Sequence, residues 1–144
     1  MTGMTQKQKL QKPSELIKLY SQKLSHEFER KLSPLGFELN FQYRSPHIAH
    51  ISGYVVFRIG WILEFDEILR QDKTDVIKVK YRYHLMNKTR RFILRYDNVP
   101  HFPKIKTYPH HKHTMHSVVE SNAPGLLEVI DEVEILILKN DKSS

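Results

Sequence analysis

The sequence contains no cysteine among its 144 residues. This absence excludes disulfide bonds, thiolate metal ligands and a cysteine nucleophile. Glycine is also scarce, with five residues in the whole chain, and the sequence has no Gly-rich phosphate-binding loop, no nucleophile elbow and no kinase signature. Proteins that bind nucleotides through a P-loop, serine hydrolases of the elbow type and kinases are therefore excluded.

Long apolar runs are missing as well. No stretch approaches the ~20 apolar residues that a membrane-spanning helix requires. Residues 1–13 are polar and lysine-rich, without an apolar run that could act as a secretory signal. We therefore expect a cytoplasmic protein that has no membrane partner.

What the chain does have is positive charge. It carries 23 Lys and Arg against 16 Asp and Glu, which gives a formal net charge of +7. Residues 72–116 contain eleven of these basic residues and three acids, whereas residues 117–144 contain two lysines and six acids. A basic centre favours an anionic partner such as nucleic acid, although positive charge also serves solubility.

The apolar pattern predicts one α+β domain with a helix near each end. Residues 14–32 are expected to be helical because apolar side chains recur every four residues and Ser14 can cap the first turn. Residues 126–137 show helical apolar spacing after Pro124. We expect a disordered arm at 1–13, a single domain at 14–139 and a disordered tail at 140–144.

Between the helices the sequence predicts an antiparallel meander of four to five strands, with both helices packed on the same sheet face. The strands are expected at residues 37–43, 53–59, 61–69, 77–85 and 90–97, with a loop at 44–50. The last two segments are joined by a short turn, which is typical of a hairpin. The polar face of this hairpin is expected to carry Lys78, Lys80, Arg82, Arg91 and Arg95.

The segment 95–116, which we expect to be a His- and Pro-rich loop, is the most informative part of the chain. Its histidines are His101, His110, His111, His113 and His116, five of the nine in the protein. Three prolines stiffen the same segment, because proline fixes φ and restrains the residue before it. Histidine changes charge near neutral pH, so it can serve acid/base chemistry, phosphate contact or metal ligation. We expect any chemical site to lie here.

The first candidate chemistry is cleavage of RNA without a metal, by attack of a 2′-hydroxyl group. Such cleavage needs a base, an acid and a cation beside the phosphate. The candidate catalytic residues are His110, His111, His113 and Asp97, the last as a carboxylate that orients a histidine. The candidate phosphate-binding residues are Lys78, Lys80, Arg82, Arg91, Arg95 and Lys112. The alternative without catalysis is a solvent-exposed, basic loop that the histidines merely line, with Asp97 and Asn98 forming a turn.

Two other kinds of site fit the same segment. The spacings of His110, His111, His113 and His116 allow them to ligate zinc or nickel, but no specific metal motif occurs and Lys112 disfavours a cation, so no cofactor is predicted. The basic sheet face could instead bind RNA or a protein without catalysis. Further candidate site residues are His84, Asn98, His101, His116, Glu64 and Glu67.

Three short motifs follow one another in the second half of the chain. They are Tyr81-x-Tyr83-His84-Leu85, Arg95-Tyr96-Asp97-Asn98-x-Pro100-His101 and Tyr108-Pro109-His110-His111-Lys112-His113. With the apolar and acidic segment 124–132, they resemble the TumE family, small toxins of prokaryotic toxin–antitoxin pairs, over residues 53–138. The resemblance implies a cognate antitoxin, a small DNA-binding protein encoded nearby.

The sequence thus predicts a toxin that acts on RNA as a metal-independent ribonuclease with histidines as its acid/base groups. The alternatives are a non-catalytic module that binds RNA or protein through a basic sheet face, and a histidine-ligated metalloprotein. The expected partners are RNA and the antitoxin, and the sequence leaves open whether the protein forms a homodimer.

Overall fold

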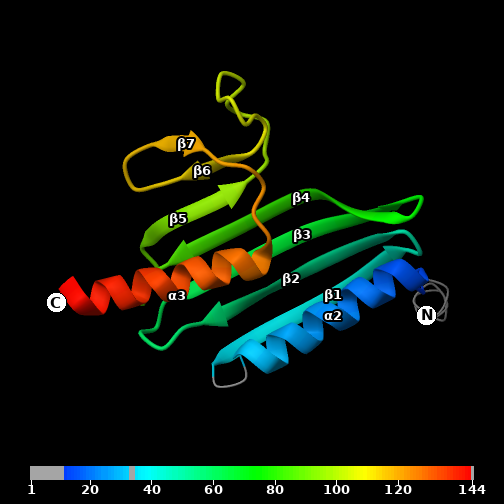
Figure 1. Ribbon diagram of the computed structural model, residues 1–144, viewed down its shortest axis with the longest axis horizontal. Helices are drawn as coiled ribbons and strands as arrows, with labels where there is room; N and C mark the ends of the chain where they lie inside the picture. Colours follow the sequence, from blue (N-terminus) through cyan, green and yellow to red (C-terminus); the bar gives the residue numbers. More distant parts are fainter. Residues whose placement is uncertain (1–11, 33–34, 144) are drawn as a thin grey trace, which may run out of the picture.

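The chain forms an antiparallel sheet of seven strands and two long helices (Figure 1). The computed structural model describes residues 12–32 and 35–143. The helices are α2 (Glu15–Leu32) and α3 (Leu126–Ser143). The strands are β1 (Gly36–Ser45), β2 (Ile48–Val56), β3 (Ile62–Asp72), β4 (Asp75–Met86), β5 (Phe92–Asp97), β6 (His111–His113) and β7 (Val118–Glu120). They lie in the sheet in sequence order, which confirms the predicted α+β meander but with more strands than expected.

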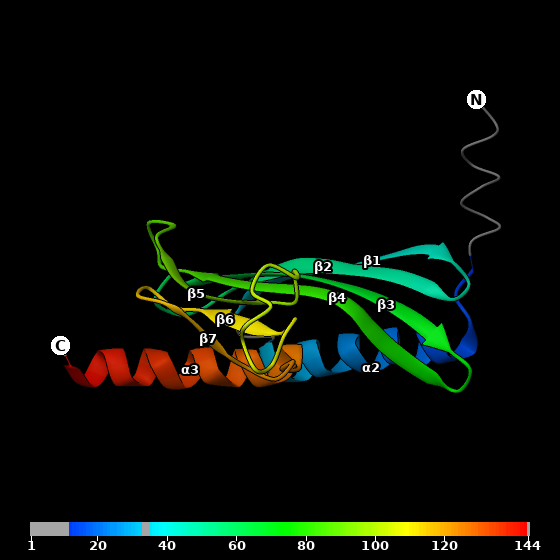
Figure 2. The same cartoon turned by 90° about the horizontal axis from the view of Figure 1, so that it is seen from above.

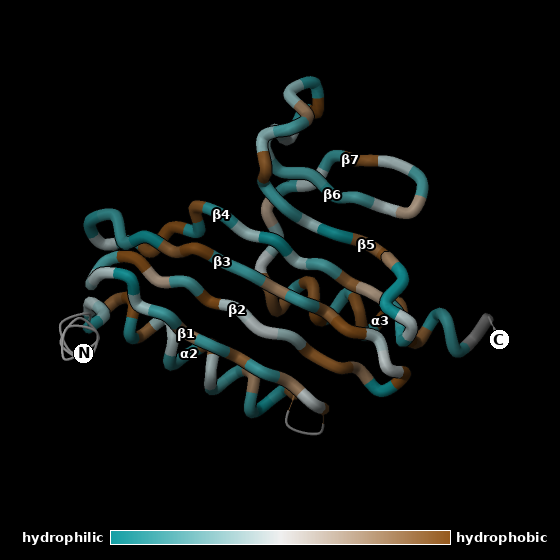
Figure 3. The backbone as a smooth tube through the Cα atoms, turned by 180° about the vertical axis from the view of Figure 1, so that it is seen from behind, coloured by the Kyte–Doolittle hydropathy of each residue, from teal (hydrophilic) through white to brown (hydrophobic). Residues whose placement is uncertain are grey.

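Both helices cover the same face of the sheet, as predicted, and the opposite face carries no helix (Figure 2). We call these the inner face and the open face; Figure 3 views the molecule from the open side, with the strands in front of the helices. The core lies between the inner face and the helices. Its largest fully buried side chains include Tyr81, Tyr83, Phe28 and Phe65.

The two helices begin and pack largely as their sequences predict. The Ile17 N–H group donates a hydrogen bond to Ser14 Oγ (3.2 Å), so Ser14 caps α2. Helix α3 buries Leu126, Val129, Ile130, Val133 and Ile137, the predicted apolar stripe. It continues to Ser143, so residues 140–143 are helical and not the disordered tail that was expected. The arm predicted at 1–13 lies mostly outside the described residues; Lys12 and Pro13 have no regular structure.

The strands differ from the prediction in two places. Most of the predicted loop 44–50 is strand, because β1 extends to Ser45, β2 starts at Ile48, and a two-residue turn joins them. Pro46 is the first residue of this turn, and proline has the fixed negative φ that suits this position in a type I or type II turn. The second difference is that the His- and Pro-rich segment contributes β6 and is followed by β7. These two strands of three residues show no apolar alternation that would reveal them.

A β-bulge in β4 overturns one predicted position on the polar face. Ile68 pairs with Lys80 and Leu69 pairs with Lys78, so Val79 is an extra residue on β4. The extra residue turns Lys78 to the inner face, where its Nζ atom donates to Tyr83 Oη and to the Pro124 carbonyl oxygen, both at 2.6 Å. Burial lowers the pKa of Lys78. The prediction that this lysine lies on the polar face with Lys80 and Arg82 is wrong.

Gly53 of β2 lies directly against the backbone of β1. A Cβ atom at this position would lie 1.9 Å from the Glu38 carbonyl oxygen and 2.9 Å from Phe65 Cζ. Gly53→Ala is therefore expected to lower the free energy of unfolding by about 1–3 kcal/mol, measured by urea denaturation. Gly36→Ala in β1 is the matched control, because the nearest atom to its Cβ would be 3.8 Å away. Equal loss of stability in the two variants would contradict this account of the packing.

Candidate active site

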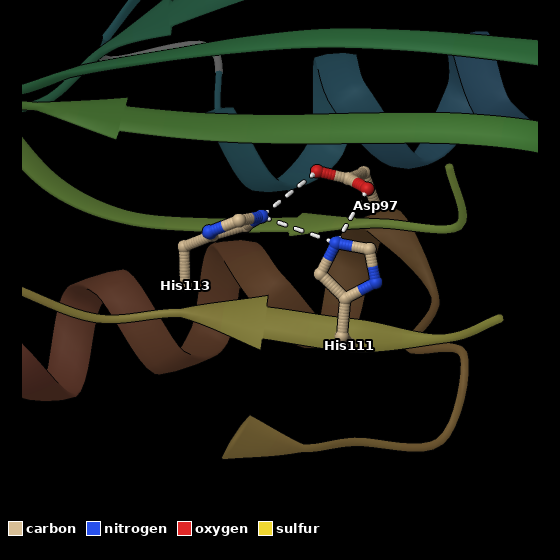
Figure 4. Close-up of side chains that lie close together, drawn as sticks. All are labelled: Asp97, His111 and His113. Carbon is tan, nitrogen blue, oxygen red and sulfur yellow. Dashed lines mark hydrogen bonds and ion pairs between the residues drawn. The ribbon is translucent and has the colours of Figure 1, made fainter. Parts of the chain in front are cut away.

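The pairing of β5 with β6 brings two loop histidines beside the end of the last long hairpin. Arg95 pairs with His113, and Asp97 pairs with His111. Because side chains alternate along a strand, these four side chains share the open face. Asp97, His111 and His113 point toward one another there (Figure 4). We refer to these three residues as the Asp97–His111–His113 cluster.

Short distances join the members of this cluster. His111 Nε2 lies 2.8 Å from Asp97 Oδ1, and His113 Nε2 lies 3.6 Å from Asp97 Oδ2. The Nε2 atoms of the two histidines are 3.1 Å apart. Asp97 and His111 are buried, whereas 19% of the His113 side chain is exposed. His113 is therefore the member of the cluster that a substrate can reach.

Arg95 holds the cluster from one side. Its Nε atom donates to Asp97 Oδ2 at 2.9 Å, and its Nη2 atom donates to His113 Nε2 at 3.1 Å. Asp97 Oδ1 also accepts a hydrogen bond from the Val99 N–H group (3.0 Å), so the same carboxylate makes a turn and orients His111. The Arg95 side chain is one-third exposed and can contact a ligand as well.

The hydrogen-bond partners determine where the protons lie. His111 Nδ1 lies 2.9 Å from the Pro109 carbonyl oxygen, and His111 Nε2 lies 2.8 Å from Asp97 Oδ1, so both ring nitrogens face acceptors. His113 Nε2 faces the guanidinium group of Arg95, which can only donate, and therefore accepts. His113 is neutral in this arrangement. Burial, together with the charge of Arg95, lowers the pKa of His113 and favours the same state.

Phe102 forms an apolar wall beside the two histidines. Its ring lies edge-on to His111, with centroids 5.1 Å apart, and edge-on to His113 at 5.8 Å. His101 contacts the outer side of this ring and is exposed. Phe102 was not among the predicted site residues, because an apolar residue in a loop carries no signal of its own.

The remaining loop candidates do not join the cluster. His110 Nδ1 lies 3.0 Å from Tyr81 Oη, and the two rings stack at 12°, which places His110 against a core tyrosine. Lys112 points to the inner face, where its Nζ atom donates to Glu132 of α3 at 2.8 Å. His116 is exposed in the turn between β6 and β7.

Two other candidates, Glu67 and Asn98, make local interactions only. Glu67 is buried on the inner face, where Tyr83 donates a hydrogen bond to it. Asn98 accepts from the Tyr81 N–H group and donates to the Val79 carbonyl oxygen, both at 3.1 Å, so its amide continues the pairing of β4 past the end of β5. The turn predicted at Asp97 and Asn98 is made by Asp97, which accepts from the Val99 N–H group, whereas the Asn98 amide bonds to the backbone of β4.

His84 and Glu64 lie on the open face, in the same row across the sheet as Arg95 and His113. They are register partners on β4 and β3, and His84 is also the partner of Arg95. The Nδ1 atom of His84 is buried without a hydrogen bond, and burial lowers the pKa of this histidine. Neither side chain touches the two cluster histidines through any described interaction.

The predicted basic face is only partly basic. Lys80, Arg82 and Arg95 do share the open face, but Arg82 Nη2 lies 3.5 Å from Asp66 Oδ2, and Arg95 is bonded to Asp97. Arg91 is exposed just before β5, beside the β4–β5 turn. Within 12–32 and 35–143, Lys80 makes no ion pair. The cations best placed near the cluster are therefore Arg95 and Arg82.

The cluster also has the donor set of a small metal site. Asp97, His111 and His113 offer ligand atoms that all lie within 4.8 Å of one another, and imidazole with carboxylate suits zinc or nickel. Arg95, however, places a fixed positive charge in contact with two of the three residues. Two members of the predicted metal-binding quartet, His110 and His116, lie outside the cluster.

These observations define a small α+β protein with a buried Asp–His pair and a partly exposed second histidine on the open face of its sheet. The chain belongs to the TumE family: the model of that family, described as Toxin TumE, matches residues 26–138. It is therefore a toxin of a toxin–antitoxin system, and a cognate antitoxin is its partner. Comparisons with curated proteins and with solved structures found no match. Neither helix in the described part of the chain is long and apolar enough to cross a membrane.

Proposed function

We propose that this toxin cleaves RNA without a metal ion, with the Asp97–His111–His113 cluster as its active site. The observation that carries the proposal is a partly exposed histidine, His113, whose Nε2 atom accepts a hydrogen bond from Arg95 at 3.1 Å and lies 3.1 Å from His111 Nε2. A neutral histidine at such a site can accept and return a proton near neutral pH.

In the proposed reaction, the substrate phosphate binds Arg95 and Asp97 holds the Nε2 side of His111, so that His113 Nε2 is free to accept a proton. The 2′-hydroxyl oxygen attacks the adjacent phosphorus atom, and its proton passes to His113. The bond from phosphorus to the 5′-oxygen then breaks, and His113 returns the proton to that oxygen. The products are a 2′,3′-cyclic phosphate and a 5′-hydroxyl end.

The surroundings of His113 suit both halves of this reaction. Arg95 and His111 disfavour a further positive charge beside them, so the protonated form of His113 is a strong acid that gives its proton readily to the leaving oxygen. Asp97 and His111 do not contact the substrate in this scheme. They are positioning residues, which hold the His113 ring and Arg95 in place.

The products of the reaction test this proposal directly. Purified toxin incubated with a short RNA is expected to give fragments that end in a 2′,3′-cyclic phosphate, identified by mass spectrometry. An RNA with a single 2′-deoxynucleotide is expected to resist cleavage at that position. Fragments with a 3′-hydroxyl and a 5′-phosphate would contradict attack by the 2′-hydroxyl group.

The pH dependence of cleavage should follow the charge of Arg95. Because this guanidinium lowers the pKa of His113, Arg95→Gln is expected to raise that pKa and to move the acidic limb of the kcat/KM profile to higher pH. The maximal rate is expected to fall too, since a phosphate contact is lost. Arg91→Gln, at an exposed site outside the cluster, is the control. An acidic limb that stays in place in Arg95→Gln would contradict the assignment of His113 as the base.

A further inference from the structure

A cavity of about 380 Å³ opens on the sheet beside the proposed active site. This volume is within the range of small-molecule sites. The side chains that matter for its chemistry are His50, Asp66, Ile68, Lys80, Arg82 and Val99. Ile68 and Val99 give it an apolar surface, and the others place charged groups around that surface.

The strand register connects this cavity to the histidines. Asp66, Arg82, Asp97 and His111 are successive register partners across β3, β4, β5 and β6. Neighbouring strands lie about 4.8 Å apart, so Arg82 lies about 10 Å from His111 along this row. Arg82 both lines the cavity and neighbours Asp97, and it therefore stands between the cavity and the active site.

Hydrogen bonds and charges at the rim suit a phosphorylated ligand. Asp66 Oδ1 lies 2.9 Å from His50 Nε2, and its other oxygen lies 3.5 Å from Arg82 Nη2, so one carboxylate positions two groups at the cavity. Lys80 is exposed on the neighbouring row, as the register partner of Ile68. An apolar surface between cations matches a nucleotide, which joins a flat base to a charged phosphate.

We propose that this cavity is a subsite for one nucleotide of the RNA, next to the phosphate that is cleaved. The inference rests on the proposed ribonuclease function. The base packs against Ile68 and Val99, and Arg82 contacts the phosphate that lies toward His113. Since the cavity offers apolar contact with few fixed donors toward the base, we expect it to accept more than one kind of base.

The test compares nucleotides with inorganic phosphate. Wild-type toxin is expected to bind adenosine 3′-monophosphate and uridine 3′-monophosphate about tenfold or more tighter than inorganic phosphate, measured by titration calorimetry. Ile68→Asn is expected to remove this advantage without changing the affinity for phosphate. Ile62→Asn is the matched control, because Ile62 is also half-buried on the open side of β3 and does not line the cavity.

The subsite and the cleavage reaction can fail separately. A nucleotide advantage that is absent in the wild type, or that survives in Ile68→Asn, would overturn the subsite whatever happens to RNA. His113→Ala is expected to lose cleavage but to keep the nucleotide advantage. A wild type that binds the nucleotides as described but leaves RNA intact would contradict the ribonuclease and support the cavity as a nucleotide site.

Discussion

Replacing His113 with alanine is expected to lower the rate of RNA cleavage about 10²- to 10⁴-fold, the usual contribution of a general acid/base group. The loss should be large because His113 is the one partly exposed imidazole of the cluster, and the scheme gives it both proton transfers. The affinity for RNA should change only a few-fold, because phosphate contact comes from Arg95 and Arg82. Rates and affinities would be measured on the same labelled RNA.

The control for this variant is His116→Ala. His116 belongs to the same histidine-rich segment but is exposed in the β6–β7 turn, so its loss is expected to leave the rate unchanged. If His113→Ala cleaved RNA as fast as His116→Ala, the cluster would not be an acid/base centre. If it lost affinity as strongly as rate, a binding role for the histidine would be the better account.

The second large effect is expected from Asp97→Asn. The carboxylate accepts from His111, from Arg95 and from the Val99 N–H group, and an amide cannot satisfy the two charged partners equally well. Asparagine removes the negative charge that faces His111 and Arg95. We expect cleavage to fall by about 10²-fold or more. The fold should be retained, because asparagine keeps one oxygen acceptor and the size of the side chain.

The pH dependence of kcat/KM distinguishes two causes of lost activity in Asp97→Asn, a defect in folding and a loss of the contacts that position His113. Asp97 raises the pKa of His113, so its replacement should lower that pKa and move the acidic limb of kcat/KM to lower pH. This shift is opposite in sign to the one expected for Arg95→Gln. Asp75→Asn, at an exposed position at the start of β4, is the control. An unchanged limb with a lowered melting temperature would show that Asp97 is needed only for folding.

The fold was predictable where side-chain periodicity reports burial. The apolar stripe along α3 and the alternating buried side chains of β5 both arise because these elements pack on one sheet face. The family resemblance also implied the C-terminal helix. The bulge at Val79 was not predictable in the same way. On the inner face Lys78 donates a hydrogen bond to Tyr83 and lies 3.9 Å from the Glu67 carboxylate. The position of Lys78 therefore depends on Glu67, which is distant in sequence.

The sequence indicated which residue types form the candidate site, but not which of these residues lie together. Five histidines and Asp97 were candidates in one segment, and only His111 and His113 reach the carboxylate. The reason is the register of β6 on β5, which turns alternate side chains to opposite faces and sends Lys112 to the core side. Strand β6 has only three residues, which is too short for an alternating apolar pattern to be recognised in the sequence.

The most direct test of the account is cleavage of total cellular RNA by purified toxin with and without EDTA, beside His113→Ala. We expect equal cleavage by the wild type in both conditions and cleavage about 10²-fold slower or more by the variant. Loss of cleavage in EDTA and its recovery with added zinc would contradict the metal-independent mechanism. It would show instead that Asp97, His111 and His113 act together as ligands of a metal ion.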